Sequence, residues 1–150
     1  MLRESLTEAL KTALKDRDQK SVSTIRLILA ALKDRDIAAR PKGIDQIPEP
    51  EILGLLQGMI KQRRESIALF EKGGRADLVA SESAEIVVIE RFLPKQMDEA
   101  AMKEAIKDAI AATGAAGIKD MGKVMAELKA KHAGALDFSR AGPLVKAELG

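Results

Sequence analysis

The chain has 150 residues with no cysteine, tryptophan or tyrosine, so its core must consist mainly of aliphatic side chains and methionine. The lack of cysteine excludes a disulfide framework, a thiolate zinc site and a cysteine nucleophile. A formal net charge of +2 is nearly balanced, and it does not indicate the strongly basic surface of many nucleic-acid-binding proteins.

Apolar residues recur at helical spacing in the first forty residues. A first stripe over residues 2–16 predicts one amphipathic helix. A second and more apolar stripe over residues 22–37 predicts another helix, with Asp18 or Ser21 as its N-cap.

Proline and glycine separate these helices from the next pair. They are concentrated in residues 40–50, which predicts a loop there. A third helix follows from Pro50, and Gly73-Gly74 supplies the left-handed residue that ends it. A fourth helix is predicted over residues 77–92.

Pro94 marks a break in the helical pattern, because the residue before a proline avoids the helical conformation. We therefore predict a domain boundary here, with an N-terminal helical domain at 1–93 and a C-terminal domain at 94–150. Two amphipathic stripes after the boundary predict helices over residues 98–113 and 120–132. The composition is rich in Ala, Glu, Lys, Leu and Arg, as is typical of an all-α protein.

The last predicted helix contains a proline. Asp137 or Ser139 is expected to cap this helix. Pro143 fits only if the helix begins near Arg140 or is kinked, since proline lacks the N–H that a helix interior requires. The predicted architecture is therefore four helices followed by three.

The sequence contains no catalytic or metal-binding motif. We interpret three glutamates of the fourth helix as a solvated face rather than as a catalytic pair of carboxyl groups in a cleft; they are Glu82, Glu85 and Glu90. His132 is the only histidine, so it lacks the further ligands that a metal site needs. We predict no catalytic residue, no metal and no cofactor.

The third predicted helix carries a small basic cluster, formed by Lys61, Arg63 and Arg64. Neighbouring residues on a helix diverge by about 100°, so Arg63 and Arg64 do not face one row of phosphates. The favoured interpretation is a solvated face with ion pairs within the helix.

Basic residues are in slight excess after Gly114. Lys123, Glu127 and Lys131 repeat every four residues, the spacing of a self-neutralising ladder. The functional alternative is contact with RNA phosphates, which positions a helical shape without reading its bases. The candidate contacts are Lys119, Lys123, Lys131, Arg140 and Lys146.

Four stretches of the chain together resemble the GatB/YqeY family, and most closely its stand-alone YqeY branch. They are Thr24–Lys33, Arg63–Leu78, Phe92–Met97 and Asp120–Met125. Their order and spacing match the family along the whole chain. The resemblance implies an all-helical fold in two parts.

The resemblance also implies a link to tRNA. In the aspartyl/glutamyl-tRNA amidotransferase, the related tail domain of one subunit helps to hold tRNA, while other parts transfer ammonia from glutamine. Lys123 falls in the Asp-Met-Gly-Lys-Val-Met element of that tail, and Lys146 falls in its closing Leu-Val-Lys. Where family members often carry a basic residue after Gly134, this chain has Ala135.

The leading hypothesis is a non-catalytic tRNA-binding helper protein, related to glutamine-dependent carbon–nitrogen ligases only by family and not an enzyme by itself. One alternative is a helical protein–protein interaction module. Another is an accessory component of an aminoacyl-tRNA amidotransferase complex, with amidotransferase subunits as partners. The absence of cysteine, of an apolar leader and of a membrane span predicts a cytoplasmic protein without a membrane partner.

Overall fold

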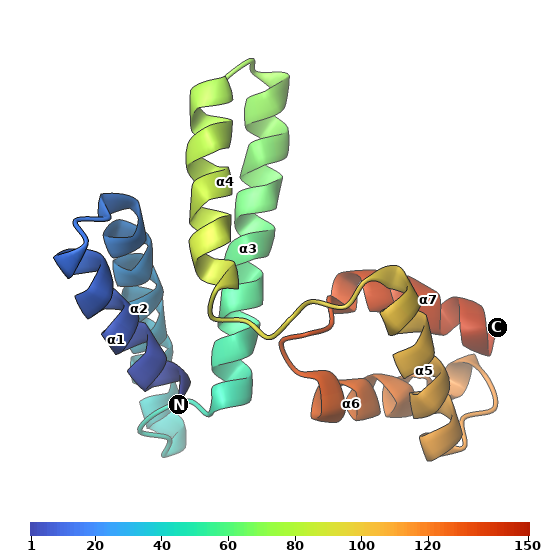
Figure 1. Ribbon diagram of the computed structural model, residues 1–150. Coiled ribbons are helices and arrows are strands. Elements are labelled where there is room, and N and C mark those ends of the chain that lie inside the picture. Colours follow the sequence, from blue (N-terminus) through green and yellow to red (C-terminus); the bar gives the residue numbers. More distant parts are fainter. The chain divides into compact units, whose positions relative to one another are not determined.

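The computed structural model describes residues 1–150, and the chain is entirely helical (Figure 1). The helices are α1 (Leu2–Lys15), α2 (Gln19–Ala39), α3 (Glu49–Lys72), α4 (Ala76–Glu90), α5 (Glu99–Thr113), α6 (Met121–His132) and α7 (Phe138–Leu149). Two 3-10 helices, η1 (Arg40–Lys42) and η2 (Ile118–Asp120), precede α3 and α6. The predicted all-α class, with four helices followed by three, is confirmed.

The chain divides into two compact units, Met1–Leu93 and Pro94–Gly150. In the N-terminal unit, α1 packs on α2, while α2 and α3 both pack on α4. Large side chains at helical spacing are fully buried at these contacts: Leu6, Ile25, Ile28, Ile52, Leu56 and Ile89. No helix of either unit has the length and apolarity that crossing a bilayer would require.

A left-handed residue closes the turn between α1 and α2. The Asp18 N–H donates to the Ala13 carbonyl at 3.0 Å, and Arg17 has a φ of 56°. Glycine usually fills this position, because a side chain there costs roughly 1–2 kcal/mol. Asp18 then accepts from the Ser21 N–H at 3.2 Å, so Asp18 is the N-cap of α2.

A partly buried ion pair fastens the loop after α2 to α1. Arg3 donates two hydrogen bonds to the Asp36 carboxylate, at 2.9 and 2.8 Å. Asp36 also accepts from the Ile47 N–H at 2.8 Å, and Arg3 donates to the Ile47 carbonyl at 3.1 Å. The hydrogen bonds from Arg3 are the main reason that the pKa of Asp36 is lowered.

A polar cluster centred on Glu85 joins α2, α3 and α4. Arg63 Nε lies 2.8 Å from one Glu85 oxygen, and Lys20 Nζ lies 3.6 Å from the other. The Arg63 and Glu85 side chains are only 13% and 17% exposed, so the predicted solvated faces are wrong for both residues. Arg64 also pairs with another helix, at 3.7 Å from Glu90. Spacing within one helix does not reveal such pairs, because their partners lie on α4.

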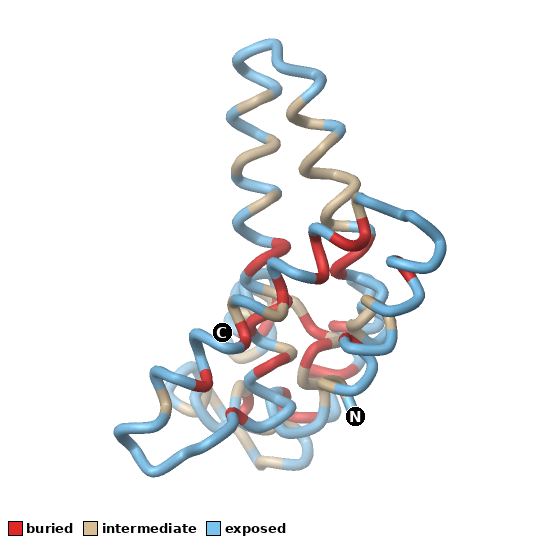
Figure 2. Tube along the Cα trace, turned by 90° about the vertical axis from the view of Figure 1, so that its left-hand side faces the viewer, coloured by how far each residue is buried: buried red, intermediate tan, exposed pale blue.

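The outer parts of α3 and α4 extend beyond the core as a helical hairpin (Figure 1). No residue from 61 to 87 is buried, and Figure 2 shows the outer half of the hairpin without a buried segment. Gly74 has a φ of 69° at the turn, which confirms the predicted left-handed stop. The hairpin is therefore held mainly by the contact between its two helices.

The buried hydroxyl of Thr24 on α2 has no hydrogen-bond partner. Because an unsatisfied buried polar group costs about 1–3 kcal/mol, we expect Thr24→Val to raise the free energy of unfolding by about 1 kcal/mol. Urea denaturation followed by circular dichroism measures the change. Thr24→Ser keeps the hydroxyl and should give no gain, and a valine variant no more stable than wild type would contradict the prediction.

In the C-terminal unit, α5, α6 and α7 pack around a core of their own. Its fully buried large side chains are Met102, Ile106, Val124, Leu128, Leu136 and Val145. Met121 and Met125 pack against this core, as their spacing of four residues predicts. The predicted N-cap of α5 is confirmed, since Asp98 accepts from the Ala101 N–H at 2.8 Å.

Helix α7 begins at Phe138, two residues before the start that Pro143 suggested. Asp137 caps it by accepting from the Ser139 N–H at 3.0 Å. Pro143 therefore lies inside the helix, where it deprives the Ser139 carbonyl of its usual donor. Both Ser139 and Pro143 are exposed, so water can satisfy this carbonyl.

Candidate nucleic-acid interface

The basic side chains predicted to contact RNA all lie exposed on the C-terminal unit. Lys119 lies in η2, Lys123 and Lys131 lie in the first and last turns of α6, and Arg140 and Lys146 lie in α7. The arrangement of these elements decides which of the five cations can act together.

Three of these cations belong to one end of the C-terminal unit. A side chain added at Gly150 would meet Ile118 Cδ1 at 3.3 Å, so the end of α7 lies against η2. Lys119 follows Ile118 directly, Lys123 lies one turn later, and Lys146 lies about one turn before Gly150. We refer to Lys119, Lys123 and Lys146 as the η2 group.

The other two cations lie near the opposite ends of their helices. Lys131 is about 12 Å along α6 from Lys123, at eight residues' distance. Arg140 is about 9 Å along α7 from Lys146 and about 120° around the helix axis. The structure therefore does not bring all five predicted contacts onto one face.

The two lysines of α6 also differ in their ion pairs. Lys131 Nζ lies 2.7 Å from Glu127, and this hydrogen bond is the main reason that the pKa of Lys131 is raised. Lys123 Nζ lies 3.9 Å from Asp120 instead of completing the predicted ladder with Glu127. Of the predicted ladder, only the ion pair between Glu127 and Lys131 is present, and Lys123 is the less tightly held of the two lysines.

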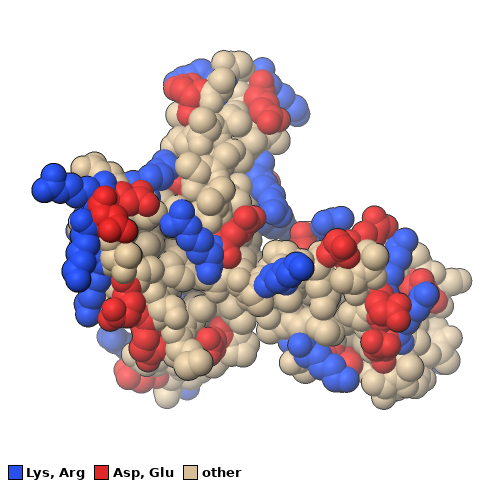
Figure 3. All heavy atoms as spheres, in the orientation of Figure 1, with Lys and Arg blue, Asp and Glu red and all other residues tan.

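Carboxylates are interspersed among the cations. Figure 3 shows positive and negative side chains alternating over the visible face of the C-terminal unit. Asp120 is partly engaged, since it accepts from the Ala116 N–H at 2.9 Å. Lys119 and Lys146 have no ion-pair partner. Glu148 does not pair with Lys146, because it lies about 200° around α7, nearly on the opposite side of the helix. The surface offers separate phosphate contacts rather than one continuous basic patch.

A lysine that was not among the predicted contacts has an aromatic partner. Lys129 Nζ lies 5.8 Å from the centroid of the Phe138 ring, within the range of a cation–π interaction. Phe138 also packs against the core of the unit. Its ring is therefore half-buried and already has protein contacts. The two residues lie on different helices, so the spacing of residues within one helix could not predict their contact.

The loop between α6 and α7 is fastened to the segment before α5. The Met97 N–H donates to the Ala135 carbonyl at 2.9 Å, and the Gln96 side-chain amide donates to the Gly134 carbonyl. Gly134 has a φ of 81° and is buried, and Leu136 after it is fully buried. This loop is therefore part of the packing of the unit.

His132 and Ser139 both have contacts within the unit. His132 is half-buried at the end of α6, as predicted, and its carbonyl accepts from the Ala135 N–H at 3.1 Å. The Ser139 hydroxyl donates to Asp137 at 2.6 Å within the cap of α7. No three histidine or carboxylate side chains are placed to hold a metal ion. The chemistry that this surface offers is the binding of anions by exposed cations.

The sequence profile described as "Yqey-like protein" matches residues 3–149, and so covers both units. The chain belongs to the YqeY-like family. The family membership predicted from the four sequence stretches is confirmed by this match. Within this YqeY-like chain, the match includes the whole η2 group and every helix from α2 to α7.

Relatives of this YqeY-like chain include three proteins each named altered inheritance of mitochondria protein 41, mitochondrial. The protein of Eremothecium gossypii is 38% identical over 88 residues, which are 59% of this chain and 46% of the relative. The protein of Kluyveromyces lactis is 34% identical over 88 residues, with the same shares. That of Saccharomyces cerevisiae is 33% identical over 84 residues, 56% of this chain and 44% of the relative. The chain spans about half the length of the curated relatives it matches.

The predicted cytoplasmic location is wrong by this comparison, because these YqeY-like relatives are named as mitochondrial proteins. The prediction depended on the absence of cysteine, of an apolar leader and of a membrane span. None of these absences distinguishes one compartment from another.

Proposed function

We propose that the protein is a non-catalytic helper that binds tRNA through phosphate contacts of its C-terminal unit. The observation that carries this proposal is the η2 group. Its three exposed lysines lie at one end of the unit, and two of them have no ion-pair partner. Such cations can hold a phosphate backbone without reading its bases.

Recognition of an RNA shape suits this surface better than recognition of a base sequence. Stacking on aromatic rings is the usual way to hold single-stranded bases. Phe138, the sole aromatic residue of the C-terminal unit, already contacts Lys129 and the core. Contacts to the phosphates of a folded RNA need no such ring.

The choice of tRNA follows from the family resemblance to the tail domain of the tRNA-dependent amidotransferase. We propose a supporting role in which this chain positions tRNA, while any transfer of ammonia from glutamine is carried out by other subunits. This role requires no nucleophile in the chain itself.

We expect Lys119→Ala/Lys146→Ala to weaken tRNA binding and to reduce its dependence on salt. Each lost phosphate contact should lower the slope of log affinity against log salt by about one. An electrophoretic mobility shift with tRNA, repeated over a salt series, measures both quantities.

The matched control is Lys103→Ala/Lys131→Ala. It removes the same charge, but both of its lysines already pair with a glutamate on their own helix. If the two variants bind alike, the η2 group does not carry the contact. If wild type binds tRNA no better than generic duplex RNA, the tRNA proposal itself fails.

A further inference from the structure

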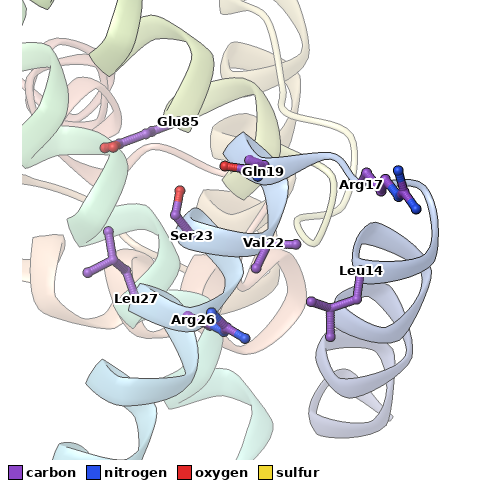
Figure 4. Close-up of a pocket in the computed structure, with 8 residues that line it drawn as sticks. All are labelled: Leu14, Arg17, Gln19, Val22, Ser23, Arg26, Leu27 and Glu85. Carbon is purple, nitrogen blue, oxygen red and sulfur yellow. The ribbon is translucent and has the colours of Figure 1, made fainter.

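A surface groove of about 760 Å³ runs over the solvent-facing side of α2 in the N-terminal unit (Figure 4). Five side chains of α2 between Gln19 and Leu27 line it over about 12 Å, or two helical turns. Leu14 of α1 and Glu85 of α4 contribute to its sides, and Arg17 contributes from the turn between α1 and α2. None of these residues belongs to the η2 group.

The groove exposes two large apolar side chains. Leu14 is 49% exposed and Leu27 is 48% exposed, whereas Val22 is buried beneath the surface. Arg26 lies between Leu27 and Leu14 in the view of Figure 4. Exposed apolar groups rimmed by polar ones are typical of protein interaction surfaces.

The charge left free in this groove is positive. Arg17 and Arg26 are exposed and have no ion pair, and no carboxylate lies three or four residues from Arg26 on α2. Glu85 is already engaged by Arg63 and Lys20. Two guanidinium groups are therefore available to a ligand that brings carboxylates.

The backbone at Arg17 supports a role for this side chain. Arg17 adopts a φ of 56°, although glycine would fill the same position without strain. Backbone strain of this kind is concentrated at functional sites. Here it places a long cationic side chain at the edge of the groove, where Figure 4 shows it extending from the turn.

We propose that this groove binds an acidic amphipathic helix of a partner protein. Leucine-like side chains of that helix contact Leu14 and Leu27, and its glutamates or aspartates contact Arg17 and Arg26. This is the mode in which an amphipathic helix lies in an apolar groove with anchors at helical spacing. The proposal uses the N-terminal unit alone and does not depend on tRNA binding.

Other ligands fit this groove less well. No aromatic side chain lines it for base stacking, and a phosphate backbone held by the two arginines would leave both leucines in water. Small molecules are usually enclosed over 70–90% of their surface, whereas most residues of this lining are exposed. A helix can cover both the leucines and the arginines.

The test is a titration of the full chain, labelled at its methyl groups, with synthetic helical peptides followed by NMR. The probe peptide is about four turns long, with leucines at positions i, i+3 and i+7 and glutamates on both flanks. We expect it to shift the methyl resonances of Leu14, Val22 and Leu27. A matched peptide with glutamine for every glutamate should bind about tenfold more weakly, since each exposed ion pair contributes up to about fivefold.

The variant Arg17→Gly/Arg26→Gln should also weaken binding of the glutamate peptide about tenfold. Glycine at position 17 relieves the left-handed strain, so the midpoint of thermal unfolding should not fall. Lost binding in this variant therefore does not reflect unfolding. Arg26→Gln alone should weaken binding less than the double variant, and Arg35→Gln is its matched control, because Arg35 is exposed on the same helix about 180° from Arg26.

The proposal is overturned if the glutamate peptide leaves the three methyl resonances unchanged, or if Arg35→Gln weakens binding as much as the groove variant. Resonances that shift with tRNA but not with the peptide would assign the groove to RNA instead. Peptide binding that requires both Arg17 and Arg26 supports the groove whether or not the protein binds tRNA.

Discussion

Replacing Leu128 by alanine is expected to lower the free energy of unfolding of the C-terminal unit by about 2–5 kcal/mol. Leu128 lies on α6 with none of its surface exposed, in the core shared with α5 and α7. Alanine leaves a cavity that the three helices can close only by shifting. Native proteins are stable by about 5–15 kcal/mol, and short units lie near the low end of this range, so the loss is severe.

Urea denaturation followed by the amide resonances of α5, α6 and α7 would measure this effect. Leu69→Ala is the control, because it removes the same atoms from a side chain that is 68% exposed. Such a surface change should alter stability by no more than about 0.5 kcal/mol. Equal midpoints for the two variants would show that the α6 core does not determine the stability of the unit.

Replacing Asp36 by alanine is expected to lower the free energy of unfolding of the N-terminal unit by about 3 kcal/mol. The change removes the partner of the Arg3 guanidinium and of the Ile47 N–H together. A guanidinium left largely out of water without its carboxylate is costly, more so than the pair was favourable. Thermal and urea denaturation would measure the loss, with Asp34→Ala, at an exposed carboxylate of the same helix, as control.

The Asp36 contact also predicts how stability changes with pH. Its pKa is lowered in the folded protein, chiefly by the Arg3 hydrogen bonds, relative to about 3.9 in an unfolded chain. The stabilisation is therefore complete above about pH 4 and is lost as the pH falls through the lowered folded value. Asp36→Asn should show a smaller loss of stability between neutral pH and pH 3 than wild type, and an equal loss in both would contradict this account.

The helices could be predicted from the sequence because their signals are local. The apolar stripes, the caps at Asp18 and Asp98 and the left-handed Gly74 all lie within a few residues of the boundaries that they determine. Helix α7 is the exception, since its cap at Asp137 prevails over Pro143, which remains within the helix. A local cap and packing against the C-terminal core together outweigh one lost hydrogen bond.

Contacts between helices could not be predicted in the same way. The pairing of Arg63 with Glu85 and the position of Lys129 over Phe138 both join residues of different helices. The same limit applies to the candidate interface. Spacing grouped Lys123 with Lys131 on α6, whereas the structure groups Lys123 with Lys119 and Lys146 through the contact of α7 with η2.

The unburied outer half of the α3–α4 hairpin has a consequence for local unfolding. Residues 65–80 have no buried side chain, and the contacts of the hairpin with Lys20 of α2 lie below them at Ser81 and Glu85, so opening this segment exposes little additional apolar surface to water. Its amide hydrogens should exchange through local opening, well before those of the helix ends that reach the core. Trypsin should accordingly make its first cuts at the tip, after Lys72 or Arg75, while the rest of the N-terminal unit is still folded.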